Sequence, residues 1–456
     1  MLLDFSVRNF SAIGEKQRLS MLTGKARGKA HHTLKAGSQR ALKLLSIYGA
    51  NAAGKSTVIR AMNFSRNTIL KDNGSLDKRF FSVNRSDDMW KEEATEFIYT
   101  LYLNKKTYEY GFVSMWKDET IVKEWLFERN SKQESKLIFI RDFISRDFKL
   151  NIKPKKFDVS YRLTVYFDDA RNEKNLLFLK AINSQKGDIF ESDSSFQYLR
   201  LIYRWFLIKL RFVYPHGSEL GNYSFYNYSD NHDELCYRLT GLGIPISKIS
   251  EVEIPIEMVF KDAPHAVMME IDAGLKSFYQ QQDIRDEDTV ALTLRLGDDY
   301  YTVEVNAEGI QKIKTITFTH GKFGTYEFRE QSDGTRRVLE LLEMIISPER
   351  DITYVVDEID RSLHPLLTEK LISMYLNAEE PNQSQLIFST HESRLLNLKV
   401  LRKDEVYFAA SKDGQSMFER LDEYEHDNPR TDLNLELAYL SGRYTGIPNI
   451  VNVTGI

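Results

Sequence analysis

Over residues 96–167 the chain alternates apolar and polar side chains with a period of two. That period is typical of strands that bury one face, and the apolar members are largely aromatic or β-branched. Short polar stretches at 104–106 and 116–119 separate the apolar runs and are suited to turns. We therefore predict antiparallel hairpins built from the runs 97–103, 107–113, 120–127 and 136–140.

The two ends of the chain follow a different pattern. Residues 1–60 predict a strand, a basic loop at 25–35, a second strand, a glycine-rich loop and a helix. The C-terminal third predicts helices at 334–346 and 365–377 among strands at 290–296, 300–305, 311–318, 352–356 and 385–389. Buried strands that alternate with helices predict an α/β core.

Residues 170–290 are mainly helical in pattern and less regular. A helix over 198–211 would place Arg200, Arg204 and Arg211 on one face, since offsets of four and eleven residues are close to whole turns. That face is either a basic contact surface or a solvated surface over an apolar underside. We predict three parts: an N-terminal half of the core with the antiparallel β subdomain at 1–168, a mainly helical insertion at 169–289, and a C-terminal half at 290–456.

The net charge of −4 over 456 residues limits the partners that the whole surface attracts. No overall basic field recruits nucleic acid, so DNA contact would need a local patch or a partner. The single cysteine, Cys236, excludes an internal disulfide and fits a reducing cytosol. Four cations interrupt the most apolar window, 196–214, and would make a membrane span costly. We expect a cytoplasmic protein with no membrane contact.

The strand at 44–48 leads into Gly-x-x-x-x-Gly-Lys-Ser, the pattern of a phosphate-binding loop. Its two glycines permit backbone angles and close approach that a Cβ forbids. Exposed amides and the helix N-terminus then meet the triphosphate charge. Lys55 would reach the β and γ phosphates, and the Ser56 hydroxyl would bind Mg²⁺. The sequence predicts an ATP or GTP site formed by Gly49, Asn51, Ala52, Ala53, Gly54, Lys55, Ser56 and Thr57.

Two further segments carry groups suited to nucleotide hydrolysis. The apolar strand at 352–356 ends in Asp357 and Glu358. Together with a phosphate loop, the Asp would hold Mg²⁺ and the Glu would polarise the attacking water. His391 follows the strand at 385–388, at the sheet edge where ligands bind in open α/β folds. It would hydrogen-bond the γ phosphate and sense its loss, so Lys55, Glu358 and His391 are the predicted catalytic residues.

A third segment, Ser332-Asp333-Gly334-Thr335, precedes an apolar helix. A hydroxyl and unhindered amides at a helix N-terminus form a second anion site. One γ phosphate does not need two cradles, so Ser332 and Gly334 are predicted to cap the nucleotide held by a second copy of the chain. The plainer interpretation is an ordinary helix cap.

In this order the motifs resemble those of ABC-type and SMC-like ATPases. In particular, the chain is similar to the RloA/AbiLi-like AAA-family ATPases of bacterial phage defence, which are relatives of the ATPase component of PARIS systems. The similarity is carried by residues 7–13, 49–57, 331–336, 357–365, 389–392 and 442–448. It implies an ABC-type P-loop core that binds ATP and Mg²⁺, with Ser56 and Asp357 as metal ligands and with Arg8 and Asn9 near the nucleotide.

The resemblance also implies a homodimer closed around two ATP molecules, with Asp360 facing the partner. It implies an accessory nuclease of a TOPRIM-related type and a phage-derived trigger, and hence a switch in antiviral defence by abortive infection. The alternative is an SMC-like ATPase of DNA repair or DNA management, which DNA-stimulated hydrolysis with a steep salt dependence would favour. A transporter ATPase subunit fits less well.

The chain departs from the ABC pattern at one point. These enzymes place a Gln after the phosphate loop to contact Mg²⁺ and water, yet no Gln lies between Thr57 and Lys132. Either Asn84 takes that role or the role is missing. We therefore predict slow hydrolysis and a switch rather than a fast motor.

Overall fold

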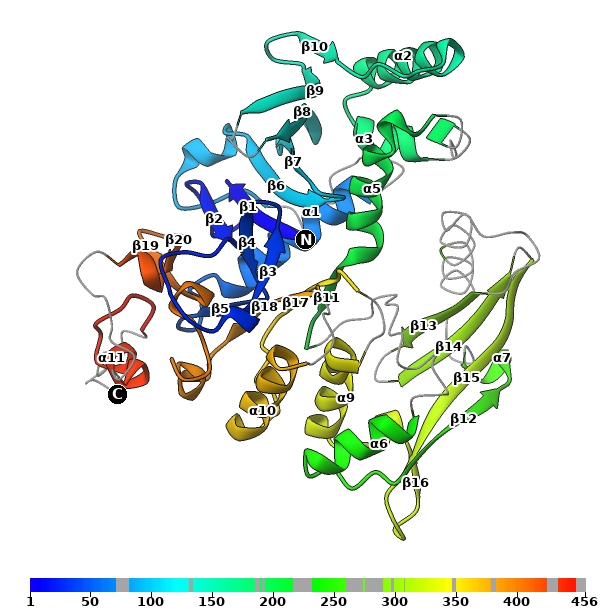
Figure 1. Ribbon diagram of the computed structural model, residues 1–456, viewed down its shortest axis with the longest axis vertical. Coiled ribbons are helices and arrows are strands. Elements are labelled where there is room, and N and C mark those ends of the chain that lie inside the picture. Colours follow the sequence, from blue (N-terminus) through cyan, green and yellow to red (C-terminus); the bar gives the residue numbers. More distant parts are fainter. Residues whose placement is uncertain are drawn as a thin grey trace. The chain divides into compact units, whose positions relative to one another are not determined.

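The computed structural model describes residues 1–70, 82–130, 134–184, 189–190, 193–215, 232–259, 274, 290–296, 299–306, 308–346, 350–378, 383–424 and 434–447 (Figure 1). The chain forms two compact units. The first comprises Met1–Phe212, Arg350–Ile359 and Glu379–Ile456, and the second comprises Val213–Glu349 and Asp360–Ala378. Each unit thus combines segments from distant parts of the sequence, and the three-part division at 168 and 289 stays a prediction.

The first unit contains a seven-stranded sheet in the order β10-β9-β8-β7-β6-β1-β2. Every pair in it is antiparallel. Its strands are β1 (Leu2–Arg8), β2 (Gln17–Ser20), β6 (Thr95–Leu103), β7 (Lys106–Met115), β8 (Thr120–Arg129), β9 (Ser135–Asp142) and β10 (Asp147–Leu150). The predicted hairpins are therefore confirmed.

One face of this sheet packs on α1 (Lys55–Leu70). Period-two alternation puts Phe97, Tyr99 and Leu101 of β6 on that face, and all three are fully buried. The ring of Phe64 on α1 lies 5.9 Å from that of Phe97. Ser65 Oγ lies 2.6 Å from the Tyr99 hydroxyl and makes a buried hydrogen bond with it. Packing against the sheet therefore holds α1, the helix that begins at Lys55.

A second sheet of the first unit has the order β11-β17-β18-β5-β19-β20. Strands β17, β18, β5 and β19 are parallel, and β20 returns antiparallel to β19. The bounds are β5 (Leu44–Tyr48), β11 (Leu210–Val213), β17 (Thr353–Val356), β18 (Gln385–Thr390), β19 (Val406–Lys412) and β20 (Gln415–Arg420). Residues of β5, β17 and β18 are buried throughout, as expected for central parallel strands.

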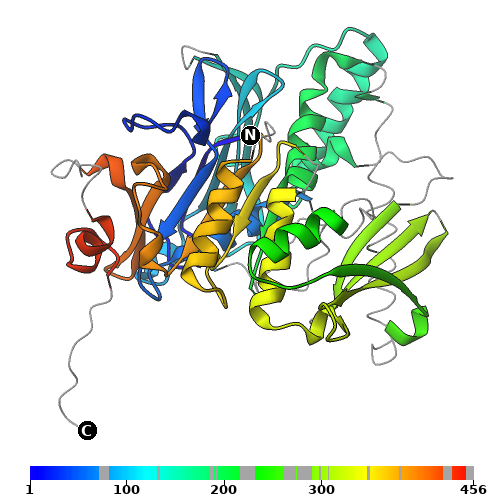
Figure 2. The same ribbon diagram turned by 60° about the horizontal axis from the view of Figure 1, so that its bottom comes forward.

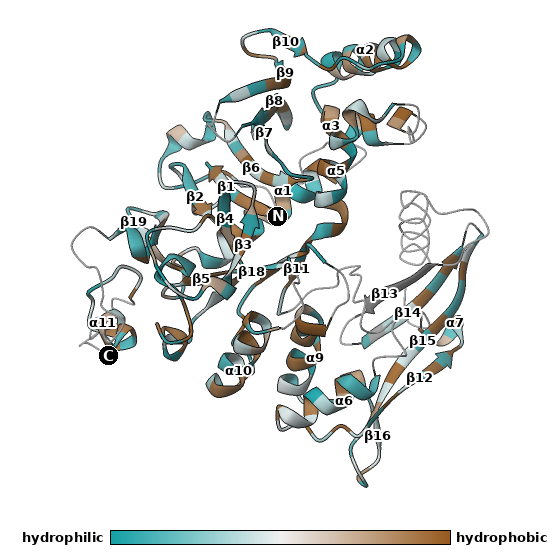
Figure 3. Cartoon of the chain, viewed as in Figure 1, coloured by the Kyte–Doolittle hydropathy of each residue, from teal (hydrophilic) through white to brown (hydrophobic). Residues whose placement is uncertain are grey.

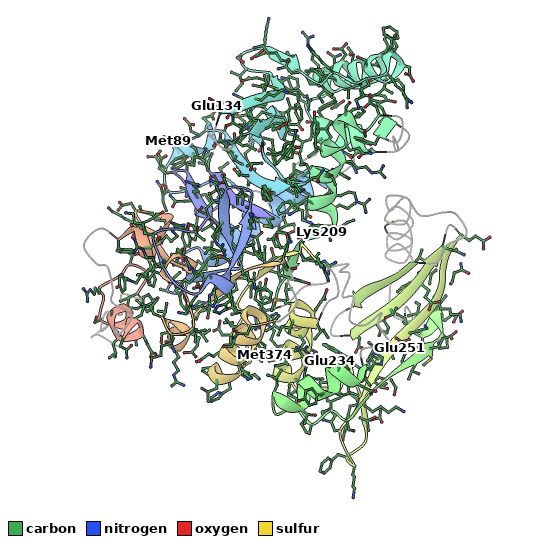
Figure 4. The ribbon with its side chains drawn as sticks, viewed as in Figure 1. Met89, Glu134, Lys209, Glu234, Glu251 and Met374 are labelled. Carbon is green, nitrogen blue, oxygen red and sulfur yellow. The ribbon has the colours of Figure 1, made fainter. Side chains whose placement is uncertain are left out.

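The helix predicted over 198–211 is wrong at its C-terminal end. Helix α5 spans Tyr198–Arg204, a π-helical turn follows at Trp205–Lys209, and β11 begins at Leu210. Arg211 therefore lies on a strand and does not share a helical face with Arg200 and Arg204. Tertiary pairing explains the change, because β11 adds an edge to the sheet beside β17. Lys209 Nζ donates to the Arg350 carbonyl, 2.8 Å away, and ties this edge to the segment before β17 (Figure 4).

The first unit also holds a small hairpin and several helices. The hairpin pairs β3 (Thr33–Ala36) with β4 (Gln39–Leu42). Helices α2 (Phe157–Asn172), α3 (Phe178–Asn183) and α11 (Leu435–Leu440) complete it with α1 and α5. Within the parts of the chain that the structure describes, no helix has both the length and the apolar character needed to cross a membrane.

The second unit is built on the sheet β12-β15-β14-β13, with β16 paired to β15. Its elements are α6 (His232–Gly241), β12 (Lys248–Ile254), α7 (Ile256–Val259), β13 (Val290–Leu296), β14 (Asp299–Asn306), β15 (Gly309–Thr319), β16 (Thr325–Glu327), α9 (Asp333–Ile346) and α10 (Pro365–Leu376). Figure 3 shows teal and brown residues mixed along β12 and β15, whose buried apolar members include Ile249, Ile313 and Phe318. Of the insertion predicted as mainly helical at 169–289, residues 185–188, 191–192, 216–231, 260–273 and 275–289 lie outside the described residues. The described part includes strands β11 and β12.

A buried ion pair joins the antiparallel sheet to the helices that follow it. Arg141 and Glu124 are fully buried, and Arg141 Nη1 donates to Glu124 Oε2 at 2.7 Å. Arg141 also donates to the carbonyls of residues 170, 173 and 176. The Glu124 carboxylate accepts the amides of Phe178 and Leu179. This pair explains why α2 and α3 belong to the first unit.

We expect Arg141→Met to lower the free energy of unfolding by about 3–5 kcal/mol, because the Glu124 carboxylate would stay buried without its cation. Urea unfolding of the purified protein measures the change. Lys117→Met is the matched control, since Lys117 pairs with Glu92 at an exposed site and should matter little. Equal losses for the two variants would contradict this role of Arg141.

Candidate nucleotide-binding site

The loop after β5 is shaped by two glycines that lie against the β19–β20 hairpin. A Cβ on Gly49 would come 2.4 Å from the Ala409 carbonyl oxygen of β19. A Cβ on Gly54, which has φ +99°, would come 2.0 Å from Ser416 Oγ of β20. The hairpin therefore forms the floor of the loop, and neither position has room for a side chain. The Val58 and Thr57 amides donate to the Gly54 carbonyl, so α1 starts directly at the end of the loop.

Lys55 lies inside this loop with only 4% of its surface exposed. Its Nζ donates to the carbonyl oxygens of Gly49 at 2.7 Å and Ala50 at 3.0 Å. The same Nζ lies 3.1 Å from His391 Nδ1. Lys55 and His391, 336 positions apart, thus meet at the carboxyl ends of β5 and β18. Both residues were predicted from the sequence to bind phosphate.

The Ser56 hydroxyl donates to Asp357 Oδ1 at 3.0 Å. Asp357 directly follows β17, so a third strand end reaches the same place. Oxygen ligands of this kind suit Mg²⁺, which binds through one or two protein oxygens and fills its shell with phosphates and waters. Across the described residues no cluster of three or more His, Cys, Asp or Glu side chains could hold a metal by itself. The Ser56 hydroxyl and the Asp357 carboxylate fit Mg²⁺ because both are oxygen ligands at one place.

Ser389 is a residue of this site to which the sequence assigned no role. It is fully buried at the end of β18. Its hydroxyl donates to Asp357 Oδ1 at 2.5 Å and accepts the Glu358 amide at 2.8 Å. The only advance signal is its place directly before Thr390 and His391. One hydroxyl thus orients both carboxylate-bearing residues.

The backbone turns sharply at Glu358. This residue has φ +48°, a left-handed backbone conformation that is costly for any residue other than glycine. Two hydrogen bonds to Ser389 hold the turn. The Glu358 amide donates to the Ser389 hydroxyl, and the Ile359 amide donates to the Ser389 carbonyl. The strand alternation therefore stops directly after Asp357, beside the cluster of Lys55, Ser56 and His391.

The Asn9 side chain makes buried hydrogen bonds to neighbouring backbone groups. Asn9 is fully buried, and its Nδ2 donates to the carbonyls of Trp90 and Glu93, each at 2.8 Å. Arg8 pairs with Glu93 at 3.0 Å, and its guanidinium lies over the Trp90 ring. The expectation that Arg8 and Asn9 lie near a nucleotide stays a prediction. We assign both residues to fastening β1 to the segment at 90–93.

Asn84 is likewise committed to local structure. It is fully buried, and its Nδ2 donates to the Ser11 carbonyl at 3.1 Å. Its Oδ1 accepts the amide and the hydroxyl of Ser86. Its own amide donates to Asn9 Oδ1. Asn84 is therefore unsuited to replace the missing Gln.

Ser332 and Gly334 lie in the second unit, at the start of α9. Ser332 is exposed, and its hydroxyl accepts the Thr335 amide at 3.2 Å. A Cβ on Gly334 would come 2.9 Å from the Ser362 carbonyl oxygen, in the turn before α10. In that turn the Leu363 amide donates a hydrogen bond to the Asp360 carbonyl. The predicted signature thus forms an exposed helix start packed on the segment that carries Asp360.

Fold and loop geometry together define a P-loop ATPase with an α/β core and an antiparallel β subdomain. Residues 44–397 match the family described as "AAA domain, putative AbiEii toxin, Type IV TA system". The match spans well over half of the chain, so the protein belongs to this family of AAA ATPases. The narrower likeness to RloA/AbiLi-like proteins stays a prediction.

No curated protein matches the chain. Solved structures similar to it include two SMC head domains. One is titled "Crystal structure of the SmcHead bound to the C-winged helix domain of ScpA"; it is 12% identical, with 92% of this chain and 97% of that chain covered and a TM-score of 0.42. The other is the "SMC head domain from Thermotoga maritima", also 12% identical, with 92% and 98% covered and a TM-score of 0.33.

We expect Ser389→Ala to weaken magnesium-dependent nucleotide binding about 10–100-fold, because Asp357 would lose the hydroxyl that orients it. Titration of a fluorescent ATP analogue at several Mg²⁺ concentrations measures the effect. Ser184→Ala is the matched control, because its hydroxyl bonds the Lys180 carbonyl at the end of α3 instead. An unchanged Mg²⁺ requirement in Ser389→Ala would refute this positioning role.

Proposed function

We propose that the protein binds Mg·ATP at the loop 49–57 and hydrolyses it slowly. One observation carries the proposal: three strand ends bring Lys55, His391, Ser56 and Asp357 together, with Lys55–His391 at 3.1 Å and Ser56–Asp357 at 3.0 Å. These are the groups that P-loop ATPases use for phosphates and metal. Family membership supports the same activity.

Each residue of the site has a distinct task in this proposal. Lys55 exchanges the Gly49 and Ala50 carbonyls for β and γ phosphate oxygens when nucleotide enters. His391, now separated from Lys55, hydrogen-bonds the γ phosphate and registers its departure. Ser56 and Asp357 would hold Mg²⁺, which would supply positive charge opposite the phosphates. Glu358 accepts the proton of the attacking water.

The proposal includes a homodimer in which Ser332 and Gly334 of one copy close over the nucleotide of the other. An exposed hydroxyl at the start of a helix suits an anion that comes from another copy of the chain, where it would compete with the Thr335 amide for Ser332. ATP then acts as a switch to the extent that it binds the closed dimer more tightly than the open one. Opening follows phosphate release.

We further propose that this switch serves bacterial phage defence and controls a partner effector nuclease. The family description, which names a toxin of a toxin–antitoxin system, supports a role in growth control or defence. The partner itself is inferred from the motif resemblance. Its capture with the tagged protein, together with loss of capture in a Lys55→Ala variant, is the supporting result.

Glu358→Gln should keep ATP binding and lower turnover by roughly 10²–10⁴-fold, because the water loses its general base. Phosphate release and analogue binding, measured on the same preparation, separate the two effects. Glu92→Gln, at an exposed site, is the matched control and should leave turnover unchanged. Normal turnover in Glu358→Gln would show that another group acts as the base.

The shared site is testable by mixing two inactive variants. Lys55→Ala and Ser332→Arg should each abolish hydrolysis alone. In an exchanged mixture, a hetero-dimer has one site with both lesions and one site with neither, so roughly one site in four is intact. Recovery of that fraction of wild-type turnover supports trans closure. A mixture that stays inactive after verified exchange would mean that Ser332 serves its own chain or no nucleotide.

A further inference from the structure

The C-terminal segment 434–447 has no part in the site described so far. It comprises α11 and the turn at 441–447. It also lies beyond residue 397, where the family match ends. Both views show α11, in red, beside the orange β19–β20 hairpin (Figure 1, Figure 2).

Gly446 bonds directly to the phosphate loop. The amide of Ala50, the residue after Gly49, donates to the Gly446 carbonyl at 2.6 Å. The Tyr439 hydroxyl donates to the same carbonyl at 2.8 Å. Burial raises the pKa of Tyr439, so its hydroxyl stays protonated and remains a donor. One carbonyl from the chain's far end therefore fixes an amide in the first half of the loop.

The contact has room only for glycine. Gly446 has φ +92°, and a Cβ there would come 2.5 Å from the Ala409 carbonyl and 3.3 Å from Gly49 Cα. A Cβ on Gly49 would also come close to the Ala409 carbonyl oxygen, at 2.4 Å. Two glycines nearly 400 positions apart thus share one backbone oxygen as their packing partner.

An aromatic cluster holds the segment in place. The rings of Tyr439 and Tyr444 each stack on Phe408 of β19, at 5.3 Å and 5.1 Å between centroids. Tyr424 meets Tyr444 edge-on, and its hydroxyl lies 2.8 Å from Thr445 Oγ1. Stacked and edge-on pairs of this kind add stability beyond simple burial. The stacking anchors Gly446 on the same hairpin that supports the loop.

We infer that Gly446 and Tyr439 are positioning residues of the nucleotide site, acting through the Ala50 amide. Docking of the C-terminal segment orients the first half of the phosphate loop, and this inference rests on the proposed ATP binding. Coupling between two sites is reciprocal in free energy. Nucleotide binding therefore tightens the docking of 434–447, and release of the segment weakens nucleotide affinity.

Gly446→Ala in the full-length protein tests the inference, with Gly442→Ala as its matched control. Gly442 has a similar φ of +85°, but its Cβ would meet only Ile447 Cδ1, at 3.9 Å. Both variants carry backbone strain, and only Gly446→Ala disturbs the loop. We expect ATP affinity to fall at least about tenfold in Gly446→Ala, and to stay near wild type in Gly442→Ala.

Tyr439→Phe is a milder second variant, which keeps the ring stack and removes one hydrogen bond. It should weaken ATP binding about three- to tenfold. Hydrogen exchange on the wild type is a readout that needs no variant of the segment. ATP should slow exchange of the Ala50 amide and of residues 442–447, and the effect should vanish in Lys55→Ala.

The outcomes separate the inference from the proposed function. A wild-type protein that fails to bind Mg·ATP overturns both. If the wild type binds Mg·ATP, and Gly446→Ala and Gly442→Ala bind it with equal affinity, the inference alone is overturned. If Gly446→Ala does not fold, absence of ATP-dependent protection at 442–447 in the wild type overturns it equally.

Discussion

Parallel pairing of β5, β17 and β18 is the constraint on which this molecule depends. Val356 pairs with Phe388, and Thr390 pairs with Tyr48. Parallel strands end at the same edge of a sheet, so this register sets the phosphate loop, Asp357 and His391 side by side. A shift by one residue would turn each strand's side chains to the opposite face and separate the cluster.

A second constraint is the close approach of backbone to backbone around the loop. Gly49, Gly54 and Gly446 all lie where a Cβ would strike the β19–β20 hairpin. Tight packing of this kind leaves the loop amides few alternative orientations. The buried Lys55 is held in this loop by the Gly49 and Ala50 carbonyls.

The predictable parts of the site were those carried by local sequence. The glycine spacing of the phosphate loop, the carboxylates after β17 and the histidine after β18 can each be located from a short motif. Ser389 could not, because a buried serine before a strand end has many uses and only its partners give it a role. The buried hydrogen bonds of Asn9 could not be predicted for the same reason. Its burial between 84 and 93 depends on segments that a motif does not show.

Regular elements were predictable wherever side-chain periodicity was strong, as in β6 to β9 and α9. The end of the 198–211 helix was not, because pairing with β17 outweighed local helix preference. The sequence by itself determined an α/β chain with a phosphate loop and its candidate partners. Only the tertiary structure decided which of those partners meet, and that the chain's last described segment lies on the loop. Such contacts join residues hundreds of positions apart, and only sheet register and close packing bring them together.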